Sequence, residues 1–141
     1  MANVHDVAAA ILKKHGPMTA LKLEKLVYYC QAWSLVWDDA PMFPERIEAW
    51  AGGPVAPALY YRHRGQFQIT EWEGKPEDLT RVQCETIDSV LKYYGNKSSQ
   101  WLSDLTHRED PWINARVGLA PLERGNCEIT LASMAEYYGS L

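Results

Sequence analysis

The chain has 141 residues, of which 47% are hydrophobic and 23% charged, and its formal net charge is −4 at pH 7. This composition excludes a disordered chain and predicts one globular domain over residues 1–141. The negative charge argues against nonspecific nucleic-acid binding, which depends on Lys and Arg neutralising phosphates.

Neither the cysteines nor the N-terminal segment indicates secretion. Cys30, Cys84 and Cys127 are odd in number and widely spaced, which predicts reduced thiols. The N-terminal segment contains Asp6 and has no apolar run long enough for a signal peptide. Nowhere do about 18 apolar residues follow one another, so the sequence predicts a cytoplasmic protein without a membrane span.

Helical spacing of apolar residues is the main pattern in the first part of the chain. It predicts a short amphipathic helix over residues 4–15, which Gly16 and Pro17 end. Thr19 is a suitable N-cap for a second helix, in which the apolar spacing continues to Trp37. The second helix has the strongest periodicity, so we expect it to form the centre of the domain.

The polar residues of this second helix define its expected faces. Lys22, Glu24 and Lys25 lie off the apolar positions, which predicts one polar stripe along the helix. Tyr28 and Tyr29 are expected to turn toward its flanks.

The middle of the chain mixes extended and helical patterns. Alternation within residues 42–50 and 67–72 predicts two short strands, which we expect to pair as a hairpin. Residues 52–54 predict a turn between the first strand and a short helix over residues 57–63, where proline suits the first helical turn.

The C-terminal half returns to helical patterns. Helices are expected over residues 80–94, from Ser98 or Ser99 to Leu105, over residues 112–117, and over residues 130–138, with a loop at 118–126. The predicted fold is therefore mainly α, a compact helical domain around a central helix with a small two-stranded β-hairpin at one side.

Metal and nucleophile signatures are missing from the sequence. No histidine has a second His or Cys three or four residues away, so no metal site and no cofactor are predicted. Cys30 lies on the apolar side of a helix, where a thiol is inert. Gly52-Gly53-Pro54 lacks the Lys-Ser or Lys-Thr of a phosphate loop, and Pro54 has no amide hydrogen to donate. These features favour a protein that is not an enzyme.

One group of residues keeps an enzymatic alternative open. Asp104, His107, Glu109 and Asp110 are close in sequence, and carboxylates beside a histidine can set its tautomer for acid–base chemistry. A charged helix end followed by a new helix start explains the same residues, and we favour this interpretation.

A basic segment with aromatic residues lies at positions 60–64. Tyr60, Tyr61, Arg62, His63 and Arg64 can stack on bases and bind phosphates, or contact carboxylates on a protein. The negative charge of the whole chain favours the protein partner, so nucleic acid is the weaker hypothesis.

Three segments starting at residues 18, 42 and 90 occur in order: MTALKLEKLVYYCQAW, MFPERIEAWAGGPVAPALYY and VLKYYGNKSSQWLSDLTHREDPW. They resemble the Panacea domain of antitoxins, the group that includes SocA-like antitoxins and phage-associated GepA-like proteins. The resemblance spans about residues 18–112. Its most specific pieces are residues 25–29, 47–50 and 53–55.

The resemblance implies a non-enzymatic antitoxin of a toxin–antitoxin system. Such a protein binds the toxin encoded by a neighbouring gene and holds it inactive, and one member also delivers its toxin to a protease. The family is associated with unrelated toxins, so the sequence does not identify the partner. Enzymatic detoxification and a protease-adaptor role stay open as alternatives, as do a homo-oligomer and a hetero-oligomeric complex.

Aromatic and arginine side chains are the expected contacts with that toxin, because these residue types dominate the energetics of protein interfaces. We expect the following residues to point outward and bind the partner: Tyr28, Tyr29, Trp50, Tyr60, Tyr61, Arg62 and Arg64.

Overall fold

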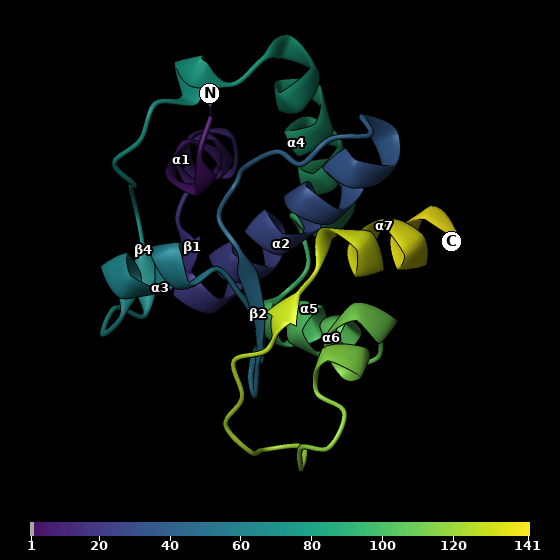
Figure 1. Ribbon diagram of the computed structural model, residues 1–141. Coiled ribbons are helices and arrows are strands. Elements are labelled where there is room, and N and C mark those ends of the chain that lie inside the picture. Colours follow the sequence, from purple (N-terminus) through teal and green to yellow (C-terminus); the bar gives the residue numbers. More distant parts are fainter. Residues whose placement is uncertain (1) are drawn as a thin grey trace.

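Helices dominate the computed structural model, which describes residues 2–141 (Figure 1). The helices in this part of the chain are α1 (Val4–His15), α2 (Ala20–Trp37), α3 (Pro57–His63), the 3-10 helix η1 (Pro76–Asp78), α4 (Arg81–Tyr94), α5 (Ser99–Thr106), α6 (Asp110–Ala115) and α7 (Leu131–Gly139). The strands are β1 (Met18–Thr19), β2 (Ile47–Trp50), β3 (Gly53–Val55), β4 (Gln68–Ile69) and β5 (Glu128–Ile129). The mainly α fold is confirmed.

Side-chain caps fix where most of the longer helices begin. The hydroxyls of Thr19, Thr80, Ser98 and Thr130 each accept a hydrogen bond from the backbone three residues on. Asn3 forms a reciprocal capping box with Asp6 at the start of α1. These local signals are present in the sequence, and the predicted helix positions agree with the structure to within a few residues.

Helix α2 lies at the centre of the domain, as predicted, with other elements on every side (Figure 1). It contacts α1, α4, α5, α7 and β3. The expected polar stripe is wrong for Glu24 and Lys25, which are buried, whereas Lys22 is half-buried. Residues 23–32 of α2 are all buried, so this part of the helix has no solvent-facing stripe and its polar side chains must find partners inside the protein.

The strands pair differently from the prediction. β2 pairs with β3 across the two-residue connection Ala51-Gly52, and β5 pairs along the other edge of β2. β4, within the segment expected to complete the hairpin, pairs instead with β1. The predicted pairing of residues 42–50 with 67–72 is therefore wrong, because strand partners depend on tertiary contacts that an alternating pattern does not specify.

Candidate partner-binding surface

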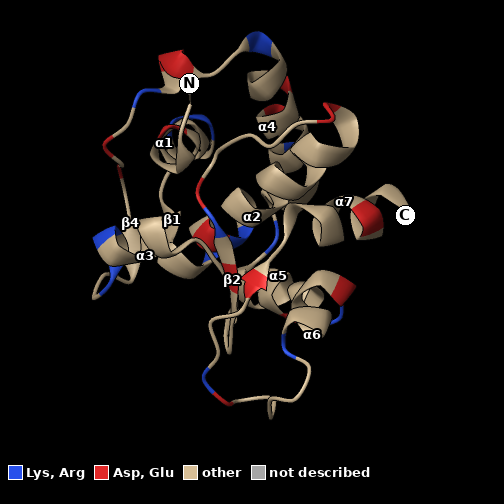
Figure 2. Ribbon diagram, viewed as in Figure 1, with Lys and Arg blue, Asp and Glu red and all other residues tan. Residues whose placement is uncertain are grey.

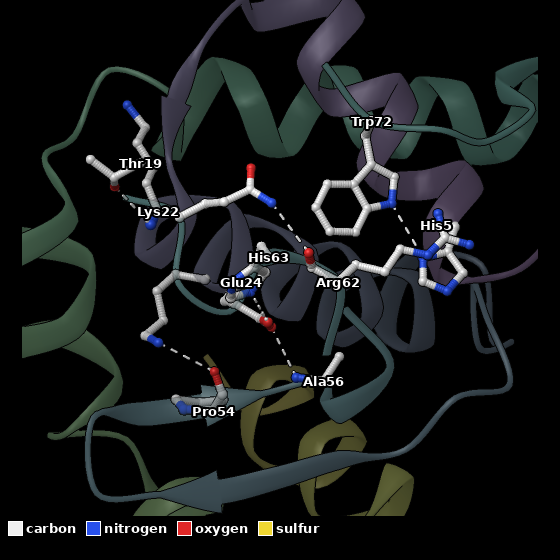
Figure 3. Close-up of polar contacts among 11 residues, drawn as sticks. His5, Thr19, Lys22, Glu24, Pro54, Ala56, Arg62, His63 and Trp72 are labelled. Carbon is white, nitrogen blue, oxygen red and sulfur yellow. Dashed lines mark hydrogen bonds and ion pairs between the residues drawn. The ribbon is translucent and has the colours of Figure 1, made fainter. Parts of the chain in front are cut away.

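A buried carboxylate holds both ends of α3 (Figure 3). Glu24 Oε1 accepts a hydrogen bond of 2.9 Å from the backbone N–H of Ala56, the residue that precedes the helix. Glu24 Oε2 lies 2.7 Å from Nε2 of His63, the last residue of the helix. Both side chains are buried, so α2 fixes α3 through one carboxylate.

Lys25 extends this buried network to β3. Its Nζ donates a 3.3 Å hydrogen bond to the carbonyl oxygen of Pro54. Complete burial lowers the pKa of Lys25 to about 8, opposed by the nearby negative charge of Glu24. Gly53 is required beside it: φ is +125°, and a Cβ there would lie 2.7 Å from Lys25 Cε.

Four of the predicted binding residues form one surface, which we call the α3 surface: Trp50, Tyr60, Tyr61 and Arg64. The rings of Trp50 and Tyr60 meet edge-on with centroids 4.7 Å apart, and those of Tyr60 and Tyr61 are 6.0 Å apart. The Arg64 guanidinium lies 5.9 Å from the centroid of Tyr61. Tyr61 is 66% exposed and Arg64 is exposed, so these side chains are available to a partner.

A hollow of 610 Å³ adjoins the α3 surface. Its lining residues are Trp50, Ala51, Gly52, Tyr60, Arg124, Gly125 and Asn126. The β2–β3 connection and the loop before β5 therefore meet beside α3, although more than 60 residues separate them in sequence.

Arg116 holds the loop that forms one wall of this hollow. Its guanidinium is buried and donates to the carbonyl oxygens of Ala49, Ala120 and Glu123, at 3.0, 3.2 and 2.5 Å. It also lies 5.1 Å from the ring centroid of Trp112. Nothing in the local sequence marks Arg116 as different from the exposed arginines, so the sequence did not predict this role.

The predicted basic cluster does not form one patch, although the C-terminal end of α3 is basic (Figure 2). Arg62 turns toward Trp72 (Figure 3), with its guanidinium 5.9 Å from that ring. It also donates to the carbonyl oxygen of Glu73. His63 is buried against Glu24. Only Arg64 stays beside Tyr61, so Arg62, His63 and Arg64 face three different environments.

Tyr28 and Tyr29 do not point outward, and that expectation is wrong. Their exposed fractions are 1% and 0%. The ring of Tyr29 stacks on Tyr94 at 4.2 Å, and the Tyr28 hydroxyl is 3.0 Å from that of Tyr138. Both tyrosines belong to the packing between α2, α4 and α7, because the flanks of α2 are covered as well as its apolar face.

The residues of the acid–base alternative have separate partners. Both ring nitrogens of His107 face backbone carbonyl oxygens, of Ser103 at 2.5 Å and of Ala51 at 3.1 Å. Asp104 accepts from Gln100. No hydrogen bond or ion pair within residues 2–141 joins His107 to Asp104, Glu109 or Asp110. The structure therefore does not assemble the carboxylate–histidine group that this alternative needs.

Two further findings concern residues 2–141 as a whole. No group of three or more His, Cys, Asp and Glu side chains there is arranged to hold a metal ion. None of the helices in this range combines the length and the apolar composition of a membrane span.

Comparison with known protein families shows which family the chain belongs to. The model of the family described as antitoxin SocA-like, Panacea domain, matches residues 23–113, well over half of the 141 residues. The chain belongs to this family. The match begins within the first turn of α2 and ends within α6, so it covers Trp50 and all of α3 but ends before the loop that Arg116 holds. Searches among curated proteins and among solved structures found no match.

Proposed function

We propose that this Panacea-family protein neutralises a toxin by binding it directly through the α3 surface. The observation that supports the proposal most is the group of Trp50, Tyr60, Tyr61 and Arg64 beside a 610 Å³ hollow. The proposed partner is the toxin encoded by the neighbouring gene, and the proposed location of the complex is the cytoplasm.

The chemistry of the α3 surface suits a protein partner. Trp, Tyr and Arg are the residues most often found as energetic anchors of protein interfaces. A hollow beside such anchors can receive a projecting side chain, whose burial excludes water from the contact. An interface of about 1,600 Å² with a few such anchors reaches nanomolar affinity.

The support beneath α3 favours tight binding. Glu24 bonds both ends of α3, and Arg116 bonds the loop on the far side of the hollow. A surface that is ordered before binding loses less conformational entropy in the complex than a mobile one. The anchors are thus presented in a fixed arrangement, and we place Arg62, which lies against Trp72, outside the principal contact.

Co-expression with the neighbouring gene product tests the proposal. The wild-type chain should co-purify with the toxin in a fixed stoichiometry and restore growth. Tyr61→Ala combined with Arg64→Ala should remove both effects. The control is Phe67→Ala, because Phe67 is 81% exposed and lies outside the α3 surface. Circular dichroism of each variant verifies folding.

Other outcomes would contradict direct neutralisation at this surface. Restored growth without a complex would favour enzymatic detoxification or delivery of the toxin to a protease. A complex that the double variant leaves intact would move the binding site to another part of the protein.

A further inference from the structure

A second hollow lies among four helices, away from the α3 surface. It has a volume of 590 Å³ and lies between α2, α4, α5 and α7. Six aromatic side chains line it: Trp33, Trp37, Tyr93, Tyr94, Trp101 and Tyr137. We call it the aromatic cleft. None of its lining residues belongs to the α3 surface or to the hollow beside it.

Several rings at the cleft are exposed rather than packed into the core. Trp37 is 51% exposed, Tyr93 65% and Trp101 38%. Trp33 and Trp37 stack with centroids 5.0 Å apart, which presents a broad aromatic wall. Large exposed rings gathered at one hollow indicate a binding site, since soluble proteins rarely leave such apolar surface uncovered.

One carboxylate lies in this aromatic environment. Glu109 lines the cleft, although only 6% of the residue is exposed. Its Oε1 accepts hydrogen bonds from the hydroxyls of Tyr29 at 2.6 Å and Tyr138 at 2.7 Å. Burial raises the pKa of Glu109, while these two hydrogen bonds and the charge of Arg108 oppose the rise.

The second oxygen of Glu109 has no partner. Among residues 2–141, no group donates a hydrogen bond to Oε2, and no Lys, Arg or His forms an ion pair with this carboxylate. No fully buried side-chain oxygen or nitrogen in this range lacks a hydrogen bond. Oε2 must therefore keep some contact with solvent, and Glu109 is one of the residues that line the aromatic cleft.

We propose that the aromatic cleft binds an arginine side chain of a polypeptide partner. The guanidinium stacks on the aromatic walls and donates to Oε2 of Glu109. A planar guanidinium suits both contacts, because it stacks on rings and pairs with carboxylates. Lys97 Nζ lies 4.8 Å from the ring centroid of Trp101, which lines the cleft, so this ring already accepts a cation on one face.

Charge and volume decide between the possible occupants. A neutral apolar ligand would remove water from Oε2 without replacing its hydrogen bonds, which is costly for a carboxylate. A guanidinium supplies donors and the opposite charge. The 590 Å³ volume exceeds that of a single side chain, which leaves room for residues flanking the arginine. This inference does not depend on the function proposed for the α3 surface.

Titration with a short peptide tests this site. The full-length protein is titrated with acetyl-Gly-Arg-Gly-amide and, as its neutral isostere, acetyl-Gly-citrulline-Gly-amide, while NMR follows the indole N–H resonances. The arginine peptide should shift the signals of Trp33, Trp37 and Trp101 saturably, with an affinity about tenfold above that of the citrulline peptide. Equal affinities, or no saturable shift with arginine, would overturn the proposal.

Variants then locate the contact. Glu109→Gln should abolish the preference for arginine over citrulline, and Trp101→Ala should weaken the arginine peptide several-fold. Phe67 is 81% exposed and does not line the cleft, so the control Phe67→Ala should change neither the preference for arginine nor the affinity for the arginine peptide. Because Glu109→Gln alters the Tyr29 and Tyr138 hydrogen bonds, Trp37→Ala serves as a second test at an exposed ring. An arginine preference that survives in all three cleft variants would refute the site.

Discussion

Replacing Lys25 by methionine tests whether burial of this ammonium controls how stability varies with pH. Lys25 is completely buried, and its ammonium has a single hydrogen bond, to the Pro54 carbonyl oxygen. Burial lowers its pKa to about 8 from an ordinary 10.5. In the unfolded chain the amine keeps its proton up to the higher value, so the native protein loses a proton first as the pH rises.

The sign and size of the effect follow from this difference. Between pH 8 and 10.5 the unfolded state binds more protons, so the free energy of unfolding rises with pH in this window. Integrated from pH 7 to 9.5, the contribution of Lys25 is about 2 kcal/mol. Methionine has no titratable group, so it makes no such contribution to the pH dependence of stability. The stability of Lys25→Met minus that of wild type should therefore fall by about 2 kcal/mol over this range.

Urea denaturation of both proteins at several pH values measures this difference. Taking the difference cancels the contributions of other groups that titrate in this pH range, including Cys30, whose pKa is raised by burial. Lys13→Met is the matched control, because it removes the same charge from an exposed position of α1. If Lys25→Met keeps a constant difference from wild type across the range, Lys25 retains its proton in the native state and the reasoning fails.

Three further substitutions test the support of the α3 surface. Gly53→Ala should lower the free energy of unfolding by about 2 kcal/mol, because φ is positive there and Lys25 occupies the space that the new Cβ needs. The control Gly52→Ala should be nearly neutral, because no atom lies within 4 Å of its Cβ position. Urea unfolding midpoints of the two variants and the wild type measure this difference. Arg116→Met should speed amide hydrogen exchange in residues 118–126, and unchanged exchange would exclude Arg116 as the loop's anchor. Glu24→Ala should cost about 3 kcal/mol in thermal denaturation, and a much smaller loss would show that Glu24 does not secure α3.

Local signals explain why the helices could be predicted. An N-cap such as Thr80 bonds only three residues ahead, and a breaker such as Gly16 acts on the adjacent turn. The strands lacked such signals. β2 has β3 on one side and β5, nearly 80 residues later, on the other, and the alternation within β2 is compatible with many partners.

The expected outward position holds for Tyr61 and Arg64 and is wrong for Tyr28 and Tyr29, and binding of a partner stays a prediction. Trp50, Tyr60, Tyr61 and Arg64 come together because β2 and α3 are joined by the short β3 segment. Tyr28 has the same chemistry, but it lies in the part of α2, residues 23–32, in which every residue is buried. Residue type indicates what a side chain can bind, whereas burial depends on which elements surround its helix.

The hydrogen bonds of two buried glutamates distinguish a residue that supports the fold from one that can bind a ligand. Glu24 uses both oxygens inside the protein, one on Ala56 and one on His63, so its charge is fully engaged in holding α3. Glu109, which lines the aromatic cleft, uses one oxygen on two tyrosine hydroxyls, and its other oxygen has no partner among residues 2–141. Because this oxygen keeps contact with solvent, any ligand that covers it removes its water and must replace the lost hydrogen bonds. A guanidinium can replace them, whereas Glu24 has no free oxygen to offer, which is why we infer a ligand at Glu109 and none at Glu24.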